Sequence, residues 1–465
     1  MTNWLGQRIA KTRVYTFSRG GIHYADPSAP PWDSSVTAFL PVFSIIPLVD
    51  HTGSRTEPVV SVGDTVKEGM LVGRAEKSGS ANIHASVPGT VVRTISWKMP
   101  EGHTNEALVI RLEGAFDKLG RREEVFPWQD SSPVKLRELI AEYGVVTMES
   151  SGFPAAELMS SFQSLEQPRT LAVRCVFDDP WLAADYVLCR ERLKELAEGS
   201  VIAAHAAGAE RILFVVSGNG QELGAPFLAE VSAYDIPASM VIVGSRYPQR
   251  DRRELEQVLR IYEKKEALEL GNLLILGPAT LAAIHDAVKL RRPILDRYVA
   301  VGGSAVKKPR VMKVRLGSRI GDLFEQCGGF TGEPKRIATG SPILGRTVQD
   351  LNEPVIKTTY AVFAHRKGQV GEGRSRNCIG CGECRVVCPM KLDPELLFKA
   401  AGPFRPGEEN EPLAVQLLLQ DAARAGIDSV LASFCHGCCC CDVVCPSRLP
   451  LSAVIVNFAK VAGGY

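Results

Sequence analysis

Two tight cysteine groups near the carboxyl end constrain this chain more than any other feature. Ten of its 13 cysteines lie at or after residue 378. The groups read CIGCGECRVVCP and CHGCCCCDVVCP, and each fits the spacing C-x-x-C-x-x-C-x-x-x-C-P. Neighbouring thiols in a tight turn do not pair freely and the amino terminus lacks the features of a secretory signal, which argues against a disulfide framework. Thiolates gathered in this way indicate metal ligands.

The register of the two groups predicts how the thiols are shared. Three thiolates at this step curl around three corners of an iron–sulfur cubane, while the fourth, beside the proline, turns toward a second cubane. We therefore predict two [4Fe-4S] clusters. The first is assigned to Cys378, Cys381, Cys384 and Cys445, and the second to Cys388, Cys435, Cys438 and Cys441.

A pair of structural zinc sites is the alternative. Zinc takes four tetrahedral ligands, usually from two C-x-x-C knuckles, and explains neither a third cysteine at the same step nor the trailing C-P. Iron and sulfur are therefore favoured. The assignment leaves Cys439, Cys440 and His436 without a ligand role. We expect these three residues to tune the potential through dipoles and solvent access.

The segments between the cysteine groups predict a helical ferredoxin domain over residues 366–465. Both DPELLFKAAG and EPLAVQLLLQDAARAGIDSVLASF have helical periodicity with acidic starts. Two clusters held by one small domain lie close enough to exchange electrons, so the domain is predicted to conduct them. Clusters that only stabilise the fold are a further reading. The different residues around the two groups, IGCGE and HGCCCCD, argue against it because they give different potentials.

The bulk composition narrows the partners. A formal net charge of +2 gives no electrostatic case for binding nucleic acid. The longest apolar stretch, AFLPVFSIIPLV at 38–49, is too short to span a bilayer and contains two prolines. If the chain serves a membrane, we expect it to do so from outside the bilayer.

Four further units are expected before the cysteine groups. Residues 1–16 form an amino-terminal segment, and 17–115 resemble the lipoyl and biotinyl type of barrel-sandwich, with Lys77 at the hairpin tip as a solvated lysine rather than a cofactor attachment site. Residues 116–295 alternate helix and strand, as an α/β domain does. Within them, GNGQELG at 218–224 misses the dinucleotide fingerprint by one position and reads as a plain turn. Residues 296–365 read as a β-grasp module of the soluble ligand-binding type.

The order of these parts is itself informative. The phrases that carry the likeness are RGGIH at 19–23, SGFP at 151–154, RYPQ at 246–249 and GSPILG at 340–345, together with the two cysteine motifs. Nearly the whole chain resembles the RnfC family of the Rnf ion-translocating electron transport complex. The cobalamin reductase of propanediol utilisation has the same layout, and the central domains are similar to the flavin-carrying, NADH-oxidising subunit of respiratory complex I.

The resemblance implies a peripheral subunit on the cytoplasmic face of the inner membrane. Such a protein takes electrons from NADH through FMN and passes them by two [4Fe-4S] clusters to membrane partners. The family's flavin loop has the form G-L-G-G-A-G-F-P, and here TMESSGFP keeps only Gly152, Phe153 and Pro154. Thr147, Met148 and Glu149 fill space that glycines would leave open to a phosphate or a ring.

We therefore expect the electron relay to be kept and the FMN and NADH pocket to be remodelled or lost. The alternative is that FMN still binds through Gly152 and backbone donors. Two functional classes stay open: a subunit of a membrane ion pump, or a soluble reductase of a corrinoid. The remaining cysteines, Cys175, Cys189 and Cys327, are expected to be small buried hydrophobic residues.

Overall fold

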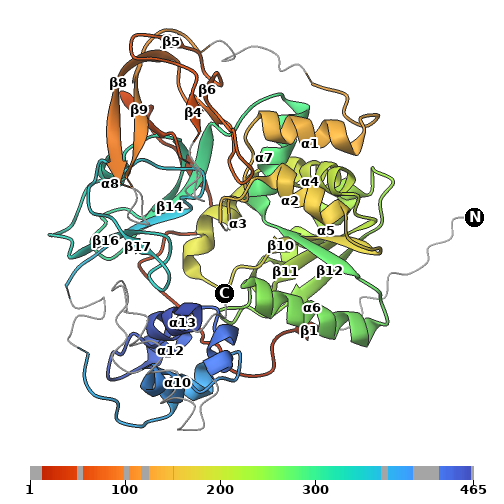
Figure 1. The fold of residues 1–465 in the computed structure, drawn as a ribbon, viewed down its shortest axis with the longest axis vertical. Coiled ribbons are helices and arrows are strands. Elements are labelled where there is room, and N and C mark those ends of the chain that lie inside the picture. Colours follow the sequence, from red (N-terminus) through yellow and green to blue (C-terminus); the bar gives the residue numbers. More distant parts are fainter. Residues whose placement is uncertain are drawn as a thin grey trace, which may run out of the picture.

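The computed structural model describes residues 13–49, 56–98, 104–116, 125–149, 151–367, 375–401 and 429–461. In this part of the chain, an α/β module is flanked by a β-sandwich and a β-grasp sheet on one side, and by a small helical module near α6 (Figure 1). This order along the chain agrees with the modules that the sequence predicts.

A five-stranded parallel sheet forms the centre of the α/β module. Its strand order is β1-β12-β11-β10-β13. The sequences RTLAVRC and RILFVVS are almost continuously buried, as parallel strands covered on both faces must be. The strands are β1 (Val14–Tyr15), β10 (Arg169–Cys175), β11 (Arg211–Ser217), β12 (Ala238–Val243) and β13 (Asn272–Leu276).

Helices cover both faces of this sheet. Residues of α1, α2, α4 and α7 share one apolar core, and α6 packs with β1 in another. Local signals fix several ends: the Ser132 side chain caps α1, Asp251 caps α6, and Gly208 ends α4 in the left-handed conformation. The helices are α1 (Pro133–Glu142), α2 (Ala155–Gln163), α3 (Ala183–Glu191), α4 (Leu193–Ala207), α5 (Gly224–Val231), α6 (Arg252–Glu266) and α7 (Pro278–Lys289). GNGQELG forms a short 3-10 helix, η2 (Gly218–Leu223), directly before α5.

The β-sandwich consists of a four-stranded sheet, β3-β9-β8-β5, and a three-stranded sheet, β4-β6-β7. Apolar residues that alternate along the strands meet between the two sheets in one core. The strands are β3 (Phe43–Pro47), β4 (Glu57–Pro58), β5 (Thr65–Val66), β6 (Leu71–Arg74), β7 (Ile83–His84), β8 (Gly89–Lys98) and β9 (Thr104–Leu112).

The β-grasp sheet has the order β17-β16-β18-β14-β15-β2. Its last member is supplied by the amino-terminal segment, because β2 pairs in parallel with β15. Since β1 belongs to the α/β sheet, the first described residues link two modules before they enter the sandwich. The elements are β2 (Ser35–Thr37), β14 (Asp296–Gly302), β15 (Arg310–Arg315), α8 (Ile320–Gln326), β16 (Arg336–Thr339), β17 (Arg346–Thr347) and β18 (Ala361–His365).

Short helices around the cysteine groups form the carboxyl-terminal module. They share an apolar core that includes Leu397, Ile455 and Phe458. The segment DPELLFKAAG contains α10, as its periodicity predicts, whereas most of the predicted helix beginning at EPLAVQ lies outside the described residues. The helices are α9 (Glu383–Val387), α10 (Pro394–Ala400), η3 (Ser429–Phe434), α12 (Cys440–Val444) and α13 (Leu451–Val461).

Candidate electron-transfer site

The two cysteine motifs adopt the same backbone conformation. In each motif a left-handed residue precedes a five-residue helix, α9 or α12, and the helix ends at the fourth cysteine in an extended conformation. Cys388 has φ −69° and ψ 114°, and Cys445 has φ −70° and ψ 111°. The left-handed positions correspond as well: Gly380 with Gly437, Gly382 with Cys439, and Lys391 with Arg448. One spacing has thus produced one local structure twice.

The four thiols assigned to the second cluster surround one cavity. Cys388 comes from the first motif, whereas Cys435, Cys438 and Cys441 come from the second, and all four line the same enclosed space. The rest of the wall is largely apolar and includes Leu392, Pro394 and Ile455. The exchange of the fourth cysteine between motifs, predicted from spacing, is therefore compatible with the geometry of this cavity.

The first motif is aligned beside the end of the second. The Arg376 backbone N–H donates to the Ser447 carbonyl at 2.9 Å, and the Ser375 hydroxyl donates to the Arg448 carbonyl at 2.9 Å. These bonds bring the chain before Cys378 next to the chain after Cys445. Cys378 and Cys381 are exposed, whereas Cys384 is buried. The thiols assigned to the first cluster thus lie on the outer side of the module.

The donor set fits iron–sulfur clusters better than single ions. Within the described ranges, no three side chains among His, Cys, Asp and Glu come together closely enough to hold one metal ion. The thiols instead line a cavity with largely apolar neighbours. A cubane places its cysteine ligands at the corners of a larger body than one zinc ion, and it is stabilised by such surroundings.

The spare cysteines have structural partners. Cys439 is in the left-handed conformation with φ 61°, and its thiol lies 3.2 Å from the Ser452 hydroxyl. Ser452 donates in turn to the Asp442 carboxylate. Cys440 is fully buried and packs with Tyr247 and Val387. The cysteines outside the two groups, Cys175, Cys189 and Cys327, are fully buried, as expected.

His436 connects the second motif to helix α6. Its Nδ1 lies 3.3 Å from the Asp251 carboxylate and its Nε2 lies 3.4 Å from that of Glu254. Burial alone would lower the pKa of His436, but the hydrogen bonds to these two carboxylates outweigh burial and raise it to about 10. A cationic imidazole therefore sits between the α/β module and the second cluster's loop.

The phrases RGGIH and RYPQ form the rest of this contact. Gly20 has φ 78°, and a Cβ atom there would lie 2.6 Å from the Cys388 carbonyl carbon. The Gly21 N–H donates to the Val387 carbonyl at 2.8 Å, and the Tyr247 hydroxyl donates to the Cys438 carbonyl at 2.9 Å. Sequence reasoning assigned these residues no role, although adjacent glycines are a signal of close backbone approach.

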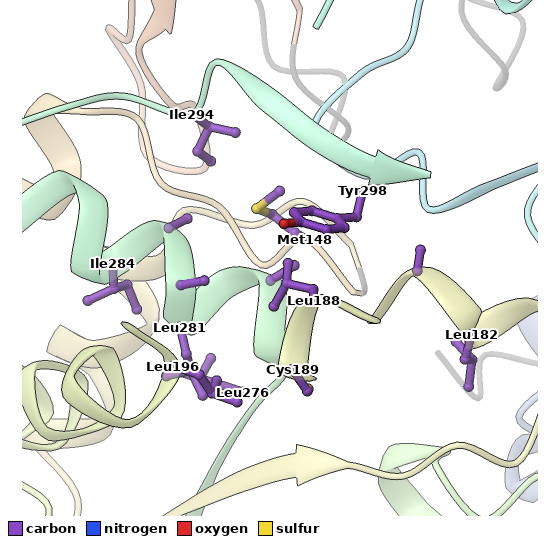
Figure 2. Close-up of a cluster of buried hydrophobic side chains, with 14 of the residues drawn as sticks. Met148, Leu182, Leu188, Cys189, Leu196, Leu276, Leu281, Ile284, Ile294 and Tyr298 are labelled. Atoms are coloured by element: carbon purple, nitrogen blue, oxygen red, sulfur yellow. The ribbon is translucent and has the colours of Figure 1, made fainter. Parts of the chain in front are cut away.

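The remnant flavin loop is closed on itself. The Phe153 N–H donates to the Thr147 hydroxyl at 3.0 Å, and the Gly152 N–H donates to the Thr147 carbonyl at 3.1 Å. Met148 is turned into the core, where Figure 2 shows it among Leu188, Ile294 and Tyr298. The backbone donors near Gly152 are therefore engaged within the protein.

Glu149 occupies the amino terminus of α7. Its carboxylate accepts from the Thr280 backbone N–H at 2.8 Å and from the Thr280 hydroxyl at 2.5 Å. Gly277 lies directly beneath, since a Cβ atom there would meet the Glu149 carboxyl carbon at 2.4 Å. A helix amino terminus of this kind favours an anion, and here the protein supplies its own.

Bulky groups occupy the neighbouring strand ends. Phe177 packs edge-on against Trp32 and Tyr186, and a Cβ atom at Gly220 would lie only 2.7 Å from its ring. Burial raises the pKa of Asp178 to about 7, although the Arg250 side chain and backbone N–H oppose the shift. The residues present at the loop and the α7 terminus therefore do not fit a bound FMN phosphate.

The sandwich hairpin is fixed rather than free. Glu157 of α2 accepts from the Ser78 hydroxyl at 2.6 Å and from the Gly79 N–H at 2.9 Å. Lys77 is exposed beside this anchor. A swinging carrier needs a mobile hairpin tip, so the anchor agrees with a structural domain.

Comparisons with known proteins assign the modules. Residues 16–115 match the RnfC barrel sandwich hybrid domain, 140–285 the Nuo51 FMN-binding domain, and 298–347 the SLBB domain. These matches confirm the predicted barrel-sandwich, complex I flavoprotein-like and β-grasp folds.

Three curated relatives, all RnfC-type proteins, extend over most of the chain. The one from the ion-translocating oxidoreductase complex of Rhodobacter capsulatus is 28% identical over 382 residues, covering 81% of this chain and 73% of the relative. The one from the proton-translocating ferredoxin:NAD(+) oxidoreductase complex of Clostridium ljungdahlii is 28% identical, covering 82% and 83%. The one from the ion-translocating complex of Pseudomonas aeruginosa is 31% identical, covering 79% of this chain but 47% of the relative.

Solved structures are more distant. A chain in the crystal structure of an NAD+-reducing [NiFe]-hydrogenase in the H2-reduced state is similar with a TM-score of 0.44 and 16% identity, covering 76% of this chain and 68% of its own length. Likeness at this level carries no argument about function.

Proposed function

Because the chain belongs to the RnfC family of ion-translocating oxidoreductase complexes, we propose that it relays electrons through two [4Fe-4S] clusters to other subunits of such a complex. The observation that carries the proposal is the cavity shared by Cys388 and three cysteines of the other motif. A fourth ligand exchanged between two C-x-x-C-x-x-C motifs is the arrangement of two-cluster ferredoxins.

The clusters supply one-electron chemistry, and the chain's own residues set where it happens. Cys384, Cys388 and Cys441 are buried, so they exclude water from the inner edges of both sites. The Tyr247 hydroxyl and the Gly21 N–H hold the backbone of the second site against the α/β module. This packing fixes the relative position of the two sites, on which the rate of electron transfer depends.

We propose that the FMN and NADH entry site is remodelled or lost in this chain. The loop around Gly152, Phe153 and Pro154 is bonded internally, and Glu149 fills the amino terminus of α7. No step of the proposed relay passes through a flavin. Electrons then enter and leave through protein partners that contact the clusters directly.

A peripheral position on the cytoplasmic side of the inner membrane is part of the proposal. Among the described residues, no helix combines the length and the apolar character that a membrane crossing needs. The relatives are named as parts of ion-translocating complexes. Contact with integral membrane proteins of the complex therefore gives this chain its place at the membrane.

Cofactor analysis of anaerobically purified protein tests the proposal. We expect about eight irons and eight sulfides per chain, as two cubanes require, with little flavin. Tagged protein from membranes is expected to bring hydrophobic subunits with it. Zinc in place of iron, or a single cluster, would refute the relay. Tightly bound stoichiometric FMN that NADH reduces would refute the remodelled pocket, and co-purification with a corrinoid adenosyltransferase instead of membrane proteins would favour a soluble reductase.

A further inference from the structure

The two cysteine loops are equivalent in structure but not in surroundings. Ile379 and His436 occupy the same position, the residue after the first cysteine of each motif. The His436 side chain is only 8% exposed and sits between the carboxylates of Asp251 and Glu254. Ile379 is 70% exposed. One loop is docked on a protein surface, and its counterpart presents the same geometry to solvent.

The docked loop shows what a partner of this structure provides. Helix α6 offers two carboxylates to His436, and the Arg253 side chain donates to the Ser433 carbonyl at 3.3 Å. The contact covers the loop beside Cys435 and Cys438 while the cluster cavity lies directly behind it. An outside partner on the first loop would reach the first cluster in the same manner.

The exposed loop has the composition of a contact surface. Residues 375–381 are all exposed, and Ile379 lies between the exposed Cys378 and Cys381. Val386, at 56% exposure, adds a second apolar side chain from α9. An apolar centre with a polar rim is the usual anatomy of a protein interface.

The charge of this loop favours an acidic partner. Arg376 within the loop and Arg448 beside it are both exposed, and Arg448 follows Ser447, whose carbonyl accepts from the Arg376 N–H. Glu383 is the acid of the same motif, and Arg385 pairs with Asp393. The balance is positive, so it attracts a protein with a carboxylate-rich surface.

We infer that the loop of residues 375–381 is the docking point for an acidic redox protein, and that the first cluster is the one that exchanges electrons with it. The inference rests on the proposed relay, in which the second cluster faces the α/β module. One electron passes between the partner's centre and the first cluster, so one centre is oxidised as the other is reduced and no bond is formed or broken.

A stopped-flow experiment with the iron-loaded full chain tests this assignment. The dithionite-reduced protein is mixed with an oxidised acidic blue-copper protein as the probe, and with a small neutral quinone as a control for cluster reactivity. We expect the rate with the copper protein to fall about tenfold or more between low and physiological salt, because attraction between opposite charges is screened. The quinone rate is expected to be insensitive to salt.

Variants locate the contact. We expect I379D, and the neutral I379Q if I379D loses iron, to slow the copper protein at least about fivefold, while the double variant R376E and R448E also weakens the salt dependence. The control V134D changes a residue that is 55% exposed on α1, away from the clusters, and is expected to keep the wild-type rate. All variants should react with quinone as the wild type does.

The outcomes separate the two proposals. Iron-loaded I379D and I379Q that match V134D, or a wild-type rate indifferent to salt, would overturn the docking assignment and leave the relay intact. Wild-type protein that holds no iron would overturn the relay and, with it, the docking assignment.

Discussion

The Glu149 carboxylate accepts two hydrogen bonds from Thr280, one from the backbone N–H at 2.8 Å and one from the hydroxyl at 2.5 Å. This places a fixed negative charge on the amino terminus of α7, beside the loop that keeps only Gly152, Phe153 and Pro154 of the flavin signature. The same carboxylate therefore stabilises the helix and excludes a phosphate from the helix terminus.

Replacing Glu149 with alanine should destabilise the α/β module. The change removes a helix cap and leaves the Thr280 N–H without its partner, so we expect a loss of about 1–2 kcal/mol in the free energy of unfolding. Urea unfolding followed by tryptophan fluorescence measures it. The control E138A removes an exposed ion pair with Lys135 and should change stability by less than about 0.5 kcal/mol. Equal effects of the two changes would contradict the capping role.

Single cysteine variants should reveal which thiols share a cluster. We expect C388A and C435A to leave the same residual electron paramagnetic resonance spectrum, because both belong to the second cluster. C445A and C378A should leave the other spectrum, and each of the four should retain about four irons. C439A and C440A should keep both clusters. If C388A instead resembled C378A, the exchange of the fourth ligand between motifs would be wrong.

Alanine at Gly20 should disturb the second cluster. The new Cβ atom would lie 2.6 Å from the Cys388 carbonyl carbon, so the loop that carries Cys388 must move. We expect faster loss of one cluster in air, measured by absorbance and iron content. The control G329A has a similar φ, 75° against 78°, with nothing within 4 Å of the added atom, so it carries only the conformational cost of about 1–2 kcal/mol. Comparable cluster loss in both variants would exclude the steric explanation.

The pairing of α4 with α7 should weaken in acid. Burial alone would raise the pKa of Glu198, but hydrogen bonds from His285, Lys289 and Trp128 outweigh it and lower the pKa to about 2. Because this pKa is lower in the folded than in the unfolded state, its contribution is complete above about pH 4.5 and is lost as the pH falls toward 2. E198Q should be less stable at neutral pH and show a smaller decrease over that range. Thermal melting of both proteins from pH 7 to pH 3 measures the difference, and parallel curves would contradict it.

Much of the fold could be predicted from local patterns. The buried runs RTLAVRC and RILFVVS became neighbouring parallel strands, and the Ser132 cap with Pro133 began α1. The amino-terminal residues could not be placed in this way. β1 and β2 are short and join the α/β and β-grasp sheets, because their partners β12 and β15 lie more than 200 residues later in the chain. A strand of two or three residues carries no periodicity from which such a partner could be inferred.

The sequence by itself determined the chemistry of the site, since eight thiols at fixed steps bend the backbone in one way wherever they occur. Gly382 and Cys439 share a left-handed conformation for that reason. Only the tertiary structure decided that His436 meets Asp251 and Glu254 while Ile379 faces solvent, and that Glu149 turns to Thr280. Spacing acts through bonds over a few residues, whereas these contacts join segments more than 100 residues apart and depend on how whole modules pack.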